Sequence, residues 1–369
     1  MDFIIKTTQL EVERYITAPQ LQGRAPSRVL ISLDLVNMFN EISRDEIFAI
    51  FSSTYPDLMP LVTMLYAEES SVFLKFADGS WHIQKMWEGV NQGCPLSAIF
   101  AALVLDRVLR PLDMMLKQRA SHRLHSQQRR MDDGHGSETH MQAYIDDCKA
   151  MVPLEDVEFF CREFHHLAPR IANARGNHLK NRILTSTTGA SALPAIAKYY
   201  GQSIADSVSR AIAEFSVEEV YDGDTKVLIN GKPKLAPVEV TTGLRLLGQP
   251  VGGEAFCTTF MKKKLENNIQ QCQNLLAVVT DHHTALALFS RCTLHKLPHL
   301  LGSEVLYRAN LYPDSGWDDW KGPLAHGINE MVRNFLASIS GVAAIPDTAL
   351  RIAYIAIAHG GLGLMDAHT

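Results

Sequence analysis

Two adjacent aspartates, Asp146 and Asp147, lie between two short runs that each have the composition of a β-strand. The runs cover residues 141–145 and 148–152, so the aspartates are predicted to occupy the tip of a hairpin. Neighbouring carboxylates repel each other, and a bound cation relieves that repulsion. Hard divalent cations such as Mg²⁺ prefer oxygen ligands of this kind. Aspartate is also common in solvated turns, so the pair alone leaves both interpretations open.

A further acidic residue ends an apolar run upstream. Residues 28–33 are largely apolar and lead into Asp34, as expected of a buried strand whose last residue emerges at the sheet edge. A helical pattern follows, in which Ser43 and Glu46 have the spacing of a capping box. Asp34 is therefore predicted to meet the hairpin aspartates from an adjacent strand. Three carboxylates on two neighbouring strands are the ligand set of a two-metal phosphoryl-transfer site.

A glycine-containing segment, residues 88–98, stands between these two acidic positions. Its glycines permit close backbone approach, and Pro95 fixes the entry to a helical pattern over residues 99–116. Apolar side chains form one stripe along that helix, which is expected to pack beneath the sheet.

These three segments resemble motifs A, B and C of reverse transcriptases, in the family's order. The matching residues are Asp34 with Phe39, then Gln92-Gly93-Cys94-Pro95-Leu96-Ser97, then Tyr144-Ile145-Asp146-Asp147. The gaps, 59 residues from 34 to 93 and 53 from 93 to 146, suit a palm domain. The pattern is similar to the enzymes of non-LTR retrotransposons. Tyr-x-Asp-Asp in place of Gly-Asp-Asp favours DNA synthesis.

The resemblance implies an α+β fold. Its parts are a polymerase palm on a split βαβ plan, with an antiparallel sheet and helices on one face, and then a mainly helical, thumb-like region. The implied boundaries are a fingers remnant or leader at 1–27, a palm at 28–255 with a fingers-like segment at 55–90 and an insertion at 185–240, and a helical thumb and C-terminal region at 256–369.

The implied activity is that of an RNA-directed DNA polymerase, a nucleotidyltransferase that extends a primer 3′-hydroxyl by two-metal-ion phosphoryl transfer. The implied partners are an RNA template, a DNA primer and deoxynucleoside triphosphates. Two Mg²⁺ ions, or Mn²⁺, would be held by the implied catalytic residues Asp34, Asp146 and Asp147. Because only 33 residues precede Asp34, most of the fingers is expected to be missing. A truncated, inactive palm remnant that binds nucleic acid or protein therefore stays an alternative.

Further roles follow from the same motifs. Phe39 occupies the steric-gate position, where its ring would exclude a 2′-hydroxyl, although a core phenylalanine gives the same pattern. Asn177 and Lys180 match the family's motif D, Leu-Asn-x-x-Lys-Thr, while Gly176 and Asn181 depart from it. The other positions have plain alternatives too. Gln92, Gly93 and Pro95 would form a helix-entry turn, Tyr144 would be a core tyrosine, and Lys180 would be a solvated lysine. The implied substrate-binding residues are Leu35, Phe39, Gln92, Gly93, Pro95, Tyr144 and Lys180.

Nucleic-acid contacts are implied farther along the chain. Residues 243–248 resemble motif E, the primer grip between palm and thumb, and residues 260–279 form a helical pattern with basic residues early. The implied nucleic-acid-binding residues are Leu247, Gly248, Lys262, Lys263 and Lys264. Because the net charge is −5, local basic clusters must meet the phosphates. A second candidate cluster adjoins a polar loop expected over 120–140, with solvated surface as its alternative: Lys117, Arg119, Arg123, Arg129 and Arg130.

Composition excludes several other classes. Hydrophobic residues make up 46% and charged residues 20% of the chain, as in globular proteins. The six cysteines lack CxxC spacing, so neither a zinc site nor a disulfide framework is expected. The chain shows neither a signal peptide nor a membrane-spanning run, so an intracellular location, cytoplasm or nucleus, and no membrane partner are expected.

Overall fold

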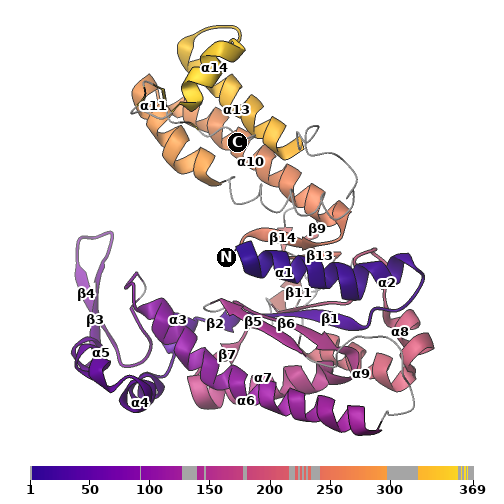
Figure 1. Cartoon of the computed structure of the whole chain (residues 1–369). Coiled ribbons are helices and arrows are strands. Elements are labelled where there is room, and N and C mark those ends of the chain that lie inside the picture. The colour runs from indigo at the N-terminus through magenta and orange to yellow at the C-terminus, as the bar shows by residue number, and fades with distance from the viewer. Residues whose placement is uncertain are drawn as a thin grey trace. The chain divides into compact units, whose positions relative to one another are not determined.

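The structure is a computed structural model, and its chain forms two compact units (Figure 1). One unit spans Glu11–Thr241, and the other combines Met1–Leu10 with Thr242–Thr369. The structure describes residues 2–91, 93–126, 139–144, 147–177, 181–215, 242–296 and 323–355, with short pieces within 221–233 and 359–364.

A four-stranded antiparallel sheet organises the first unit, in the order β5-β6-β1-β8. Every residue of β1 is buried, because its apolar side chains pack on both faces of the sheet. Strand β1 pairs with β6 over its whole length, from Arg28 opposite Pro153 to Leu33 opposite Cys148. The four strands are β1 (Arg28–Leu33), β5 (His140–Tyr144), β6 (Asp147–Pro153) and β8 (Arg182–Leu184).

Long helices cover one face of this sheet (Figure 1). Helix α6 buries the predicted stripe, with Leu105, Val108 and Leu112 fully inside the core. Helix α7 adds Phe160 and Phe164 to the same core. An α+β fold with helices on one face of an antiparallel sheet is thus confirmed. The helices are α6 (Ser97–Ser126), α7 (Val157–Ala172), α8 (Leu193–Tyr200) and α9 (Gln202–Phe215).

The prediction of a polar loop over residues 120–140 is wrong for residues 120–126, because α6 continues to Ser126. Arg119 and Arg123, four residues apart on α6, both bind the carboxylate of Asp156 at the start of α7. Asp156 is fully buried, and hydrogen bonding to it raises the pKa of Arg123. These two arginines are therefore internal ion-pair partners. Their assignment to a nucleic-acid-binding cluster is not supported, and Lys117 pairs with Asp113.

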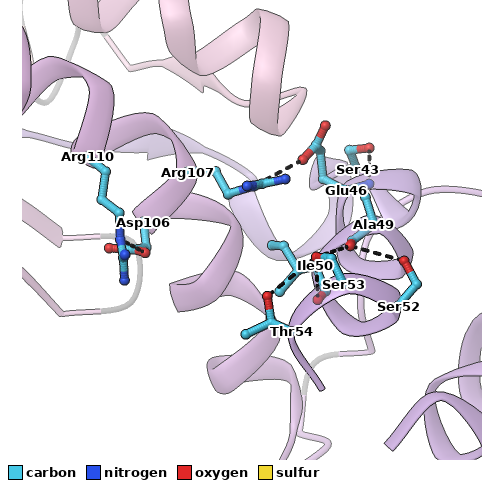
Figure 2. Close-up of polar contacts among 10 residues, drawn as sticks. All are labelled: Ser43, Glu46, Ala49, Ile50, Ser52, Ser53, Thr54, Asp106, Arg107 and Arg110. Atoms are coloured by element: carbon cyan, nitrogen blue, oxygen red, sulfur yellow. Dashed lines mark hydrogen bonds and ion pairs between the residues drawn. The ribbon is translucent and has the colours of Figure 1, made fainter. Parts of the chain in front are cut away.

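A smaller subdomain lies beside the sheet and is built from short helices and a hairpin (Figure 1). Ser43 caps α4 as predicted, because its hydroxyl accepts a hydrogen bond from the Glu46 N–H at 3.2 Å. Figure 2 shows Glu46 facing Arg107 of α6, with Oε2 3.8 Å from Nε. Strands β3 and β4 pair over their whole length as an antiparallel hairpin. The elements are β2 (Leu35–Val36), α3 (Met38–Glu41), α4 (Arg44–Thr54), η2 (Pro56–Leu58), α5 (Met59–Tyr66), β3 (Ser70–Lys75) and β4 (Trp81–Met86).

Minor elements complete this unit. Ile229 pairs with Lys232, and residues 230–231 between them lie outside the described residues. Helices α8 and α9, which fall in the predicted insertion, bury Ile196 and Val208 in the same core as the sheet. The elements are η1 (Glu13–Thr17), α2 (Ala18–Leu21), η3 (Leu154–Asp156), β7 (Arg175–Gly176), β9 (Tyr221–Asp222), β10 (Thr225–Lys226), β11 (Leu228–Ile229) and β12 (Lys232–Pro233).

The second unit is a hairpin followed by helices. Its core includes Phe289 and Phe335, whose rings stack with centroids 4.0 Å apart. Among the described helices of either unit, none has the length and apolar character that a membrane crossing needs. The elements are α1 (Asp2–Val12, up to Leu10 in this unit), β13 (Gly243–Leu246), β14 (Gln249–Gly252), α10 (Glu254–Val278), α11 (His282–Leu288), η4 (Phe289–Thr293), η5 (Leu294–Lys296), α13 (Pro323–Ser340) and α14 (Asp347–Tyr354).

The buried ion pairs at Asp156 give a stability prediction. Asp156→Ala leaves two arginines without their carboxylate and should lower the free energy of unfolding by about 3 kcal/mol. Asp106→Ala removes the exposed pair with Arg110 on α6 (Figure 2) and should change it by less than about 0.5 kcal/mol. Urea denaturation measures both values. Equal losses in the two variants would contradict the assigned role of Asp156.

Candidate active site

Asp34 is held from three directions at the end of β1. Its backbone N–H donates to Oδ1 of Asn181 at 2.9 Å, and its carbonyl accepts from the Asn177 N–H at 2.7 Å. The Asn177 side-chain amide donates to the Asp34 carboxylate at 2.9 Å. Asn177 and Asn181, which follow β7 in the sequence, thus orient this half-buried residue. Asn177, which matches motif D in the sequence, acts directly on the predicted catalytic aspartate.

The sheet register brings the two acidic segments together. Leu33 lies opposite Cys148, so Asp34 follows one end of this pairing and Asp147 precedes it. Asp34 and Asp147 therefore occupy the same end of two neighbouring antiparallel strands. Asp146 and the side chain of Asp147 lie outside the described residues, as does Ile145. The convergence of all three carboxylates stays a prediction.

A buried cation lies near this end of the sheet. Lys149 is buried, and its ammonium donates to the Ser32 hydroxyl of the neighbouring strand. Along β6, Lys149 is two residues from Asp147 and lies opposite Ser32, one pair before the end of the β1–β6 pairing. Lys149 belongs to none of the sequence motifs. A charged residue inside an otherwise apolar strand was the signal available in the sequence.

The motif B loop is anchored to α3 and α5. The backbone N–H groups of Gly89 and Val90 donate to carbonyls of residues 42 and 39. Gly89 has φ +75°, and a Cβ there would lie 2.4 Å from the backbone of Asn40. Only glycine therefore permits this approach.

Polar side chains support the same loop from beneath. The Ser97 hydroxyl donates to the Asn91 carbonyl at 2.7 Å, and the Asn91 N–H donates to the Tyr66 hydroxyl at 3.3 Å. The Arg44 guanidinium is buried over the Tyr66 ring and donates to the Gly89 carbonyl at 2.9 Å. Burial lowers the pKa of Arg44, and the charge of Glu88 opposes that shift. The loop is thus held by hydrogen bonds from the buried side chains of Arg44 and Ser97.

The predicted nucleotide-pocket residues have different environments. Gly93 and Pro95 are exposed on the motif B loop, and Gln92 lies outside the described residues. Leu35 is buried in β2, opposite Gly176. Phe39 is half-buried in α3 and packs against the core. Its ring therefore packs as a core phenylalanine would, and part of its surface is still exposed. Lys180 and the side chain of Tyr144 lie outside the described residues.

The predicted primer grip is the hairpin of β13 and β14 in the second unit. Leu247 and Gly248 form its two-residue turn, with φ of +49° and +87°. A leucine at positive φ is strained, and such strain is concentrated at functional positions. Gln9 clamps the far end of the hairpin with hydrogen bonds to both the N–H and the carbonyl of Gly252.

Basic side chains follow this hairpin on α10. Lys262 and Lys263 are exposed, whereas Lys264 is half-buried with its ammonium 5.7 Å from the Phe260 ring centroid. Burial lowers the pKa of Lys264, and the charges of Arg245 and Lys296 lower it further. Several cations of the second unit therefore lie close together, an arrangement suited to a polyanion.

Among the side chains that the structure describes, no three acidic, histidine or cysteine groups come together as a metal site. Two of the three predicted ligands lie outside this set. The donor chemistry of the predicted set, carboxylate oxygens at one end of two paired strands, fits Mg²⁺ or Mn²⁺.

Residues 5–176 match the family model described as reverse transcriptase (RNA-dependent DNA polymerase). The matched segment, a little under half of the chain, includes all three motifs and is similar to reverse transcriptases. No curated protein matches the sequence significantly.

Solved structures similar to the chain include telomerases from two yeasts. Apo telomerase from Candida tropicalis is 11% identical, with a TM-score of 0.37, over 92% of this chain and 50% of that one. Telomerase from Candida albicans, in complex with a fragment of telomeric RNA, is 12% identical, with a TM-score of 0.35, over 89% and 52%. The chain thus spans about half the length of these two structures.

The contact at Gly89 gives a matched comparison of two glycines. Gly79, at the tip of the β3–β4 hairpin, also has positive φ but has open space where a Cβ would lie. Gly79→Ala should lower the free energy of unfolding by about 1 kcal/mol, through backbone strain alone. Gly89→Ala adds the backbone clash and should lower it by about 1 to 3 kcal/mol more. Guanidinium denaturation that finds equal losses would contradict the close approach at Gly89.

Proposed function

We propose that this protein is an RNA-directed DNA polymerase in which Asp34, Asp146 and Asp147 bind two Mg²⁺ ions, with Mn²⁺ as a substitute. The observation that carries the proposal is the pairing of β1 with β6. Its last pair, Leu33 with Cys148, directly adjoins Asp34 and Asp147 in the segment that matches the reverse transcriptase model. The inactive-remnant alternative is not favoured, because the domain match covers all three motifs with their acidic residues in place.

The proposed chemistry depends mainly on positioning and charge. Bound Mg²⁺ supplies the Lewis acidity that lowers the pKa of a primer 3′-hydroxyl and neutralises the triphosphate. The protein's contribution is to hold its carboxylates in place before substrate arrives, which avoids reorganisation during the reaction. Asn177 and Asn181 provide this preorganisation at Asp34, through the carboxylate and the backbone respectively.

We assign the nucleotide pocket to the motif B loop and α3. Exposed Gly93 and Pro95, with Gln92, would contact the incoming nucleotide, and Phe39 would lie against its sugar. Tyr144 would support the primer end, Lys180 would lie near the phosphates, and the Leu35 carbonyl would assist the metal ligands. The rigid anchoring of the loop through Arg44 supports a preformed pocket.

We assign nucleic-acid binding to the second unit. The strained turn at Leu247 and Gly248 is the proposed primer grip, and Lys262, Lys263 and Lys264 are the proposed phosphate contacts on α10. An RNA template and a DNA primer are the proposed ligands. Salt-dependent binding of an RNA–DNA duplex is expected if these lysines meet phosphates.

The finer identity rests on the sequence motifs. We assign the enzyme to a retrotransposon of the non-LTR type, working in the cytoplasm or nucleus. The palm at 28–255, with its fingers-like segment at 55–90 and insertion at 185–240, and the thumb at 256–369 remain the proposed domains.

Primer extension on an RNA template with Mg²⁺ tests the proposed catalysis. Asp34→Ala and Asp146→Ala should each lower the rate by a factor on the order of 10³ or more, because several kcal/mol of transition-state stabilisation are removed. Asp45→Ala, which removes an exposed carboxylate on α4, should leave the rate unchanged. Primer extension at the wild-type rate by Asp146→Ala would contradict the assignment of the metal ligands.

The proposed steric gate is tested by nucleotide choice. Phe39→Val should raise the use of ribonucleotides relative to deoxynucleotides by about tenfold or more, because the smaller side chain leaves room for the 2′-hydroxyl. Phe48→Val is the matched control, since Phe48 is also half-buried against the same core. Competition between ribo- and deoxynucleotides in primer extension measures the ratio. An unchanged ratio in Phe39→Val would leave Phe39 with a packing role alone.

A further inference from the structure

A chain of hydrogen bonds connects α7 to the backbone of Asp34. Asn181 is fully buried, and its Oδ1 accepts the Asp34 N–H at 2.9 Å. The other side-chain atom of this amide, Nδ2, lies 3.3 Å from Nε2 of His165. Nδ1 of His165 lies 2.8 Å from the Cys161 carbonyl, one turn earlier on α7. A helix on one face of the sheet is thus linked to the end of β1.

The donor and the acceptor of each of these hydrogen bonds can be assigned by starting from Asp34. The Asp34 N–H is a donor, so Oδ1 of Asn181 must face it and Nδ2 must face the histidine. Nε2 of His165 then accepts, and Nδ1–H donates to the Cys161 carbonyl. Every link has one donor and one acceptor, with His165 neutral and its proton on Nδ1. This tautomer is a specific prediction of the network.

Gly176 makes room for the histidine ring. A Cβ at this position would lie 2.5 Å from Nε2 and 2.7 Å from Cδ2 of His165, closer than real contacts allow. Gly176 also pairs with Leu35, the residue after Asp34. The two departures from motif D, Gly176 and Asn181, therefore serve one arrangement. One admits the ring, and the other joins it to Asp34.

We propose that His165 and Asn181 are positioning residues that fix the direction in which the Asp34 carboxylate points. Asp34 lies one residue beyond β1, and its N–H is bound by a side chain there. His165 holds the Asn181 amide in the one orientation that offers Oδ1 to this N–H. This inference rests on the proposed function, because it treats Asp34 as a metal ligand.

Loss of the His165 side chain should change how firmly Asp34 is held, although the link between the two residues runs through Asn181. In His165→Ala the buried Nδ2 of Asn181 loses its acceptor, and the amide is no longer held in one orientation. The Asp34 N–H then loses a fixed acceptor, and the carboxylate samples more directions. Partners of metal ligands typically contribute about 10- to 100-fold to metal affinity or activity.

The first test uses the intact protein and does not depend on activity. Imidazole ¹⁵N NMR above neutral pH should show His165 with its proton on Nδ1, and hydrogen exchange should show a protected Asp34 amide. Exchange at Asp34 should be at least about tenfold faster in His165→Ala and in Asn181→Ala. The control His166→Ala removes the exposed neighbour on the same helix and should leave it unchanged. A proton on Nε2 of His165 would overturn the network.

The second test measures metal binding and turnover. Mn²⁺ titration followed by EPR should show affinity weakened by about 10- to 100-fold in His165→Ala, with His166→Ala like the wild type. In primer extension, the Mg²⁺ concentration for half-maximal rate should rise while the KM for deoxynucleotides stays unchanged. Unchanged metal affinity in His165→Ala would overturn the positioning role.

A double-mutant cycle isolates the contact between the ring and Gly176. Gly176→Ala displaces the ring without removing any hydrogen-bonding group, so it should weaken Mn²⁺ binding about as much as His165→Ala. In the His165→Ala background the added methyl group meets no ring, and Gly176→Ala should then have little further effect. Additive losses would contradict a shared mechanism.

Failure of this inference can be distinguished from failure of the proposed function. Suppose that the wild type extends primers and Asp34→Ala does not. If His165→Ala then has the metal affinity of the wild type, only the positioning role is contradicted. If the wild type extends no primer under any metal condition, the proposed function falls. The Asp34 exchange and Mn²⁺ affinities then still decide whether His165 orders this carboxylate.

Discussion

The antiparallel pairing of β1 with β6 is the constraint on which the rest of the structure depends. Because side chains alternate along a strand, a slip of one residue would turn every side chain of β1 to the opposite face. The observed register places Leu33 opposite Cys148 and leaves Asp34 and Asp147 at the same end. The same pairing buries the apolar side chains against α6 and α7. Burial of the core and placement of the acidic residues therefore follow from one register.

Buried polar groups then determine how each segment meets this sheet. Asn181 ties Asp34 to α7, Arg44 ties the motif B loop to the β3–β4 hairpin, and Asp156 ties α6 to α7. Each is fully or almost fully buried and bound by several partners, as buried polar groups must be. Removing one partner leaves the others unsatisfied, so these residues specify geometry more than they add stability.

Much of the palm could be predicted from local patterns. The apolar run before Asp34, the cap at Ser43 and the hairpin over residues 70–86 have signals within a few residues of chain, and the structure confirms them. Long-range polar contacts have no such signal. Arg123, near the end of α6, binds Asp156, 33 residues away, and the environment of His165 depends on Asn181 and Gly176. Adjacent histidines on a helix gave no reason to select one of them.

The proposed catalysis requires Asp34, Asp146 and Asp147 to converge on a pair of divalent ions. Crystals of the protein soaked in Mn²⁺, with diffraction recorded at the manganese absorption edge, test it most directly. Two anomalous peaks about 3.5 to 4 Å apart are expected, with oxygens of all three aspartates as ligands. Peaks that exclude Asp34, or a carboxylate of Asp34 turned away from β6, would contradict it.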